Sequence, residues 1–429
     1  MREKLFGRDL MLAFRVNEKD FTRNRKQPFS HLLLFMLNLL RKSIGIEIDN
    51  FVRFMSDKLG NTKAVDFTTS AFVQNRKKIK PAVFQYLSEI ITTNYYEIEE
   101  SSIKLFYGLR ILAVDGSIIT LPNHPTLKKD FGFSKNQTQR EIVQARASVL
   151  YDVMNKFVLD SFISHLNVQE RELALKHQTK WKARDLIIYD RGYPGFEFFK
   201  AHLDRSIDFL IRMKVAESNL VKDFVQSGKR SAIVEFAPGQ HKSFKDKDYN
   251  KTSHLKIRLL RIELSNGVIE ILATSLLDSA KYPHKMFKEL YFKRWEVETF
   301  YDELKNKLKI EYFTGYSTQS IEQDFYCAIF ISNLQTVVIN GIQEELAEQN
   351  KEKEYAYKIN TNLSYGFLKN RVLDLLCSVT PIENVLKELE EILLKNTIPI
   401  RPNRTNLREI GKYKKRLKPK VLKNQKDAI

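Results

Sequence analysis

The stretch ILAVDGS, residues 111–117, marks the place where the sequence changes from helical to strand periodicity. An apolar run ends there in an Asp-Gly pair, and the run IITLP follows directly. A short apolar run bounded by a turn pair predicts a buried strand that ends at Asp115. We therefore expect the Asp115 carboxylate at the edge of a sheet, facing a cleft instead of the core.

Strand and helix patterns alternate after this point. Residues 145–165 predict two strands around a tight Met154-Asn155 turn. A helix, a strand, a second helix and a second strand are predicted next, at residues 168–181, 185–190, 194–203 and 208–215. The strand DLIIYD ends in Asp190, which places a second carboxylate at a strand end. This order predicts a mixed α/β core over residues 108–215.

A helical pattern precedes the core. We expect a helical N-terminal DNA-binding domain over residues 1–107, with helices near 30–44, 47–59 and 81–95. A further helix, beginning at Thr69 or Ser70, carries the polar series Gln74, Asn75, Arg76, Lys77 and Lys78. A short basic helix suits a DNA groove, and it suits an ordinary protein surface equally well.

Four more segments complete the predicted organisation. Residues 216–280 are rich in Lys, Phe and β-branched residues and predict a β-rich insertion, with Asn266-Gly267 as a hairpin turn. Residues 281–315 predict a core helix, and helices resume over 316–400. The tail 401–429 holds eleven Lys or Arg and predicts a mobile segment that binds phosphate without sequence preference.

The predicted core helix gathers four polar side chains in the stretch YFKRWEVETFYDELK, residues 291–305. At about 100° per residue, these four share an arc of roughly 60°, next to an apolar arc that would pack on the core. They are Tyr291, Arg294, Glu298 and Lys305. Taken alone, the polar arc is also what a solvated charged face would show.

The composition indicates a folded protein that attracts polyanions. Lys and Arg number 71 against 52 Asp and Glu, a net charge of +19, and 43% of the 429 residues are apolar. No apolar run reaches the roughly 18 residues of a membrane-spanning helix, and the first residues lack a signal core, so we expect no membrane and a cytoplasmic location. The two isolated cysteines, Cys327 and Cys377, exclude a disulfide framework and a zinc ribbon.

The carboxylates Asp115, Asp190 and Glu298 would converge if the core helix packs on the predicted sheet. Three ionised carboxylates repel one another unless a cation joins them. Mg²⁺ or Mn²⁺ suits such oxygen ligands, and two ions together can stabilise the entering and leaving oxygens of a phosphoryl displacement.

The chain resembles the DDE insertion-sequence transposases that carry the YREK signature, Y-x2-R-x3-E-x6-K. Tyr291, Arg294, Glu298 and Lys305 match it at every position. The stretches ILAVDGS, IIYDRGY and FLIRMK and the long β-rich gap before the glutamate resemble the same family, over about residues 108–314.

The resemblance implies a ribonuclease H-like catalytic core interrupted by the β-strand insertion. It implies that Asp115, Asp190 and Glu298 are the catalytic metal ligands. It also implies that the protein binds the terminal inverted repeats of an insertion sequence and catalyses DNA strand cleavage and strand transfer. Tyr291, Arg294 and Lys305 would then contact phosphates near the cleaved end.

Further expectations concern DNA contacts and partners. Arg212 and Lys214, on the strand after the second aspartate, are candidates for additional phosphate contacts. The implied partners are double-stranded DNA, at the transposon ends and at the target, and a second copy of the chain in a homodimeric synaptic complex on the nucleoid of a prokaryotic cell. Two alternatives stay open: a ribonuclease H-like nuclease that cuts without joining, and a catalytically silent DNA-binding repressor derived from a transposase.

Overall fold

The computed structural model describes residues 1–23, 26–40, 42–59, 66–98, 102–135, 139–215, 218–239, 247–264 and 267–401. The predicted mobile basic tail therefore lies almost wholly outside the described residues, as does Asn266 of the expected hairpin turn.

Five strands form the centre of the molecule. They are β1 (Arg110–Thr120), β3 (Glu141–Asp152), β4 (Val158–His165), β5 (Asp185–Tyr189) and β6 (Asp208–Met213). Their order across the sheet is β4-β3-β1-β5-β6, with β1 antiparallel to β3 and β3 antiparallel to β4. β5 runs parallel to β1, and β6 runs parallel to β5. Numbered within the core this is the order 3-2-1-4-5 of the ribonuclease H-like fold, which confirms the expected mixed α/β class.

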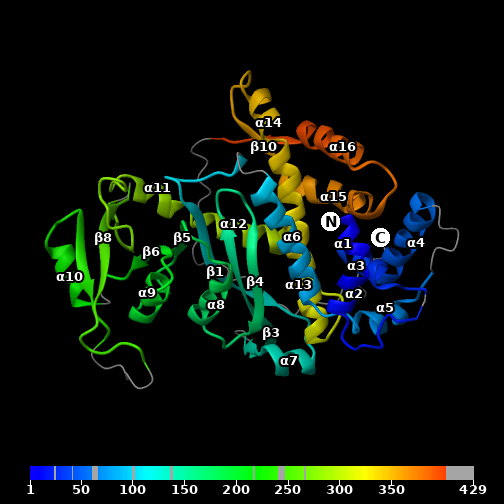
Figure 1. Ribbon diagram of the computed structural model, residues 1–429, viewed down its shortest axis with the longest axis horizontal. Coiled ribbons are helices and arrows are strands. Elements are labelled where there is room, and N and C mark those ends of the chain that lie inside the picture. Colours follow the sequence, from blue (N-terminus) through cyan, green and yellow to red (C-terminus); the bar gives the residue numbers. More distant parts are fainter. Residues whose placement is uncertain are drawn as a thin grey trace.

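The sheet separates two buried clusters. Alternate residues of β1 face opposite sides, so Ile111 and Ala113 belong to the larger cluster and Leu112 and Val114 to the smaller. Two helices, α8 (Glu170–Lys176) and α9 (Phe196–Leu203), cover the side of the smaller cluster. The helix α12 (Trp295–Asn306) covers the other side (Figure 1). The expected helix at 168–181 is shorter than predicted, because a 3₁₀ turn replaces α-helix from His177 to Lys180.

The insertion extends the core sheet. Its strands are β7 (Ser231–Phe236), β8 (Leu255–Glu263) and β9 (Ile269–Thr274), and it also contains a helix that the sequence reading missed, α10 (Asn219–Gln226). β9 pairs with β6 and β8 pairs with β9, both antiparallel. This pairing satisfies the backbone groups that β6 would otherwise expose at the edge of the core. Gly267 adopts φ of 78°, as a hairpin turn requires.

Helices from both ends of the chain pack on the larger cluster. The N-terminal ones are α1 (Arg2–Phe6), α2 (Arg8–Phe14), α3 (Phe29–Leu37), α4 (Ile44–Leu59), α5 (Thr69–Arg76) and α6 (Ala82–Ile98). The C-terminal ones are α13 (Thr318–Gly341), α14 (Gln343–Asn350), α15 (Thr361–Cys377) and α16 (Ile382–Lys395). Smaller elements are α7 (Pro125–Phe131), β2 (Phe133–Lys135) on the edge of β3, and the pair β10 (Tyr357–Ile359) and β11 (Thr397–Pro399).

The helix predicted over 30–44 ends earlier, at Leu37, and α1 and α2 were not predicted. The larger buried cluster is one set of side chains whose members range from Leu5 to Leu393 in the sequence. The terminal helices and the sheet therefore share one core. Within the described residues, no single helix is long and apolar enough to cross a membrane; α13 and α14, bent by 50°, pass that test only as a pair.

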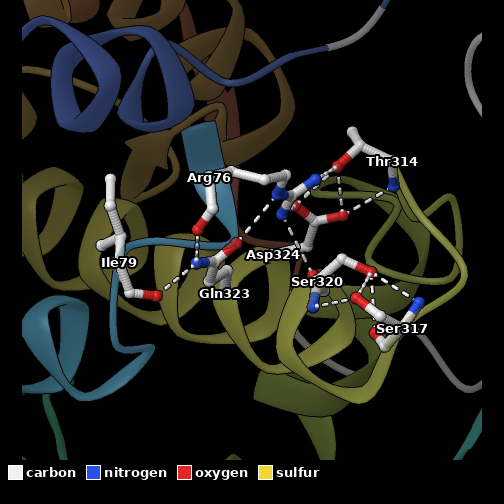
Figure 2. Close-up of polar contacts among 7 residues, drawn as sticks. All are labelled: Arg76, Ile79, Thr314, Ser317, Ser320, Gln323 and Asp324. Carbon is white, nitrogen blue, oxygen red and sulfur yellow. Dashed lines mark hydrogen bonds and ion pairs between the residues drawn. The ribbon is translucent and has the colours of Figure 1, made fainter. Parts of the chain in front are cut away.

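One buried arginine joins the N-terminal helices to α13 (Figure 2). Arg76, at the end of α5, is 3% exposed, and its guanidinium lies 2.9 Å from Asp324 Oδ1. It also donates to Gln323 Oε1 at 2.8 Å and to the hydroxyl of Thr314. Gln323 Nε2 donates back to the carbonyl oxygens of Arg76 and Ile79 at 3.0 and 2.8 Å. Arg76 therefore serves the packing of α5 on α13 and is not available as a DNA contact on an exposed helix face.

Candidate active site

Asp115 lies inside β1, and the expectation that the strand ends there was wrong. The antiparallel register with β3 continues from Leu112 opposite Asp152 to Thr120 opposite Gln144, so β1 runs through the Asp-Gly pair. The parallel ladder between β1 and β5 stops earlier, at Ala113 opposite Ile188. Asp115 is therefore in a strand that is paired with β3 on one side and is free of β5 on the other.

Asp190 follows the last residue of β5 and is level with Asp115. The last paired residues are Ala113 and Ile188, and each aspartate follows two residues later on its own chain, so both lie just beyond the same end of the β1–β5 pairing. The same two-residue period turns both toward the side of Ala113 and Ile188, which belong to the larger cluster. This is the side that α12 covers.

The polar side chains of the core helix come from two helices, and the prediction of one continuous helix was wrong. α11 (Met286–Phe292) and α12 are separated by Lys293 and Arg294. The amide of Arg294 donates to Tyr291 O at 3.1 Å, and the amide of Val297 donates to Arg294 O at 3.2 Å. These bonds to the third preceding residue are those of a 3₁₀ turn, which winds more tightly than an α-helix.

The tighter turn changes which side chains face the core. Tyr291 and Arg294 are each only 6% exposed, whereas Glu298 and Lys305 are half-buried. A solvated charged face therefore does not describe this stretch. Lys305 Nζ donates to Ser117 Oγ at 2.7 Å, and Ser117 lies two residues beyond Asp115 on β1, so the helix is tied to the strand of the first aspartate.

Arg294 lies among the three carboxylates. Its guanidinium donates to Glu298 Oε1 at 2.8 Å, and it interacts electrostatically with Asp190 and Asp115. Burial raises the pKa of Asp115 to about 6, and the negative charges of Glu298 and Glu170 act in the same direction. The Gly116 amide and Arg294 oppose this shift without cancelling it. The site is thus a partly desolvated group of anions around one cation.

The donor set suits a hard divalent cation, because all three candidate ligands are carboxylates. Among the residues that the structure places, however, no three His, Cys, Asp or Glu side chains stand close enough together to hold a metal ion. Asp115 and Asp190 lie just beyond the same end of the β1–β5 pairing, and Glu298 is taken up by Arg294. Ligation by all three would require Glu298 to exchange Arg294 for the cation.

A cavity of about 620 Å³ adjoins Tyr291 and Arg294, between α11 and the strands β6, β8 and β9. The Tyr291 hydroxyl and the Arg294 Nε are buried, and within the described part of the chain neither has a hydrogen-bond partner. Arg212 also lines the cavity and forms a 2.9 Å ion pair with Glu270. Lys214 is exposed and lies one residue beyond the end of β6 at Met213, so the strand does not carry it as predicted.

Sequence reasoning missed two residues that shape the site. Tyr301, assigned only to the apolar arc, donates its hydroxyl to Asp115 O at 3.1 Å. Glu170, at the start of α8, packs against Gly116, where an added Cβ would lie 3.1 Å from Glu170 Cγ. No sequence pattern indicates Glu170, because a contact across two elements leaves no periodic signal.

Comparisons with known proteins identify the family of the chain. The family model described as "Transposase DDE domain" matches residues 106–334, more than half of the chain. Among solved structures, the chain is similar to the piggyBac transposase in its synaptic complex with hairpin DNA, with 10% identity and a TM-score of 0.41, over 91% of this chain and 84% of that chain. A TM-score this low carries no argument about fold or function. The search of curated proteins gives no match.

Proposed function

Because the chain belongs to the transposase DDE domain family, we propose that it binds the terminal inverted repeats of an insertion sequence and catalyses DNA cleavage and strand transfer there. The observation that carries this proposal is the position of Asp115 and Asp190 on the face that α12 covers with Arg294 and Glu298. Paired carboxylates beside a buried guanidinium suit a reaction on a phosphodiester, where both a divalent cation and a phosphate must be held.

The reaction needs two displacements at phosphorus. Water forms a bond to the phosphorus at the transposon end while the bond to the 3′ oxygen breaks, which leaves a 3′ hydroxyl and a 5′ phosphate. The 3′ hydroxyl then forms a bond to a phosphorus of the target DNA while a target 3′ oxygen leaves. Divalent ions bound by Asp115, Asp190 and Glu298 would supply Lewis-acid stabilisation of the entering and leaving oxygens.

The remaining residues are proposed to hold DNA. The unpartnered Tyr291 hydroxyl and Arg294 Nε can donate to phosphate oxygens in the adjoining cavity. Lys305 would add a point charge beside Ser117, two residues beyond Asp115 on β1, while Arg212 and Lys214 would extend the contact along the end of β6. Pairing of two DNA ends would require two copies of the chain, so we propose a homodimer in the synaptic complex.

The test uses a labelled duplex that carries the DNA flanking the gene. With Mg²⁺, each of Asp115→Asn, Asp190→Asn and Glu298→Gln should lower the rate of nicking by more than about 100-fold, because each removes one charged metal ligand. DNA binding measured in EDTA should persist. Asp302→Asn is the matched control: Asp302 is exposed on α12 one turn after Glu298 and bonds Asn306, so its loss should leave nicking unchanged.

The products separate the alternatives. Nicking with joined product on added target DNA identifies a transposase, and nicking without joining identifies a nuclease. Binding without either reaction identifies a repressor. Wild-type nicking by any of the three carboxylate variants would rule out the proposed metal ligands.

A further inference from the structure

A further cavity is lined by residues of the N-terminal helices α1 and α2. These helices lie on the far side of α13 from α12 (Figure 1). The volume of the cavity is about 570 Å³, and α1, α2, the end of α5 and residues 19–23 and 27–30 line it. Its charged lining comprises four cations and one carboxylate, namely Arg8, Lys19, Arg23, Lys78 and Asp20. The Asp20 Oδ2 accepts two bonds from Asn17, at 2.9 and 3.2 Å, so this carboxylate is engaged by its own turn.

A buried amide donor belongs to a residue that lines this cavity. Gln27 is 6% exposed, and its Nε2 has no hydrogen-bond partner among the residues that the structure describes. A chain of bonds fixes the orientation of the amide: Lys78 Nζ donates to Asn75 Oδ1 at 2.7 Å, and Asn75 Nδ2 donates to Gln27 Oε1 at 2.5 Å. Because an ammonium can only donate, neither amide can be reversed, and Gln27 must present its NH₂ group.

This chain makes the Gln27 amide a strong donor. The positive charge of Lys78 polarises Asn75, which in turn polarises Gln27. A buried donor without an acceptor costs about 1–3 kcal/mol, and a bound acceptor would remove that cost. An amide donor beside four cations fits an oxyanion such as a phosphate, because the one carboxylate of the lining already accepts two bonds from Asn17.

We infer that this cavity binds a phosphate of the DNA backbone, with Gln27 Nε2 and Lys78 at its floor and Arg8, Lys19 and Arg23 at its rim. The inference rests on the proposed function for the choice of DNA over a free anion. The exposure of the three rim cations supports that choice, because they can reach successive phosphates of one strand. The cavity is lined by Asn75 and Lys78, which belong to the basic stretch for which the sequence left a DNA groove and an ordinary protein surface equally open.

The cavity is rigidly connected to the catalytic core. Asn75 and Lys78 flank Arg76, whose guanidinium is fixed to α13 by Gln323 and Asp324 (Figure 2). A phosphate bound in the cavity would therefore have a fixed position relative to the sheet, and the contact would set the register of the DNA without reading its bases.

The experiment measures binding of the full chain to a fluorescent duplex in EDTA over a series of salt concentrations. The combined variant Arg8→Gln, Lys19→Gln, Arg23→Gln should bind about 10-fold or more weakly, and the slope of log affinity against log salt should fall by up to about three. Gln27→Glu keeps an acceptor for Asn75 but puts a carboxylate oxygen in place of the donor, and it should also weaken binding. The charge-matched control, Lys353→Gln, Lys358→Gln, Lys387→Gln, changes exposed lysines of the C-terminal region and should keep the wild-type slope.

Two outcomes would overturn the inference. One is wild-type affinity and slope in the rim variant and in Gln27→Glu, each with an unchanged melting temperature. The other is an equal loss in the control, which would assign the effect to total charge. If inorganic phosphate stabilises the wild type but not Gln27→Glu, while DNA affinity is unchanged, the cavity binds a free anion and DNA is the wrong ligand. Because EDTA excludes cleavage, a failure of the proposed catalysis would leave these results readable.

Discussion

Arg294 contacts or lies near all three carboxylates of the candidate active site. It is buried, it bonds Glu298, and it lies near both aspartates. Burial is the main cause of the raised pKa of Asp115, and the Arg294 guanidinium opposes this shift, whereas the charges of Glu298 and Glu170 add to it. The same side chain keeps an Nε donor without a partner. It therefore links the acidic residues to the cavity in which we propose that DNA phosphates bind.

We predict that substitution of Tyr291 changes stability and activity in opposite directions. Its hydroxyl is buried without a hydrogen-bond partner, so Tyr291→Phe should leave the free energy of unfolding unchanged or raise it by about 1 kcal/mol. If the hydroxyl donates to a phosphate, the same variant should nick DNA about tenfold more slowly, the equivalent of one lost hydrogen bond.

Tyr301→Phe is the control for this prediction, since the Tyr301 hydroxyl already donates to Asp115 O. That variant should lose about 1 kcal/mol of stability in a denaturant titration. A destabilised Tyr291→Phe with full nicking activity would contradict the proposed role of Tyr291.

Three elements depart from simple periodicity, and each departure positions a functional group. β1 continues through Asp115 because β3 pairs with it on one side, while β5 stops short on the other. The 3₁₀ turn between α11 and α12 directs Tyr291 and Arg294 inward. The packing of α5 on α13 buries Arg76 in a network with Gln323 and Asp324, while Gln74 and Lys77 of the same basic stretch stay exposed.

The buried contacts of Arg76 between α5 and α13 predict how its substitution changes stability. Arg76→Met should lower the free energy of unfolding by about 3–5 kcal/mol, because it leaves the carboxylate of Asp324, only 12% exposed, without its partner. Arg76→Lys should rescue little of this loss, since one ammonium cannot replace a guanidinium that bonds Gln323, Thr314 and Asp324 at once.

Lys77→Met, at the exposed neighbouring position, serves as the control and should change stability by less than about 0.5 kcal/mol. Equal stability of the Arg76 and Lys77 variants in urea would show that the buried contacts of Arg76 do not hold the two helices together.

At the scale of the whole molecule, one core joins the N-terminal helices, the sheet and the C-terminal helices. The chain has two tryptophans, Trp181 and Trp295, and both lie within the catalytic part of the sequence. Tryptophan fluorescence therefore reports on the unfolding of that part alone. Comparing it with circular dichroism tests whether the whole core unfolds in one step.

Phe35→Ala tests whether the N-terminal helices unfold together with the rest of the core. Phe35 is fully buried against Phe51, Phe67 and Phe72, so the truncation should cost about 3–5 kcal/mol. In a cooperative molecule the fluorescence midpoint should fall together with the circular dichroism midpoint. Phe209→Ala, in the smaller cluster, should give the same coincidence. A fluorescence midpoint that stays at the wild-type value in Phe35→Ala would show that the N-terminal helices unfold separately.

The sequence by itself predicted the succession of core strands and helices and the β-strand insertion, and the family resemblance added the candidate site residues, whose roles stay a prediction. These features rest on local periodicity and on motif spacing, which are written along the chain. The chain's membership in the transposase family is likewise decided at this level.

Only the tertiary structure decided where those residues face. Asp115 within a strand, the burial of Arg294 and the engagement of Arg76 with α13 depend on partners far away in the sequence, which local periodicity cannot encode. The same holds for the amide of Gln27, whose unpaired donor follows from contacts with Asn75 and Lys78 about fifty residues later. Periodicity predicts which residues an element contains, and packing between elements sets which of their polar groups remain available for chemistry.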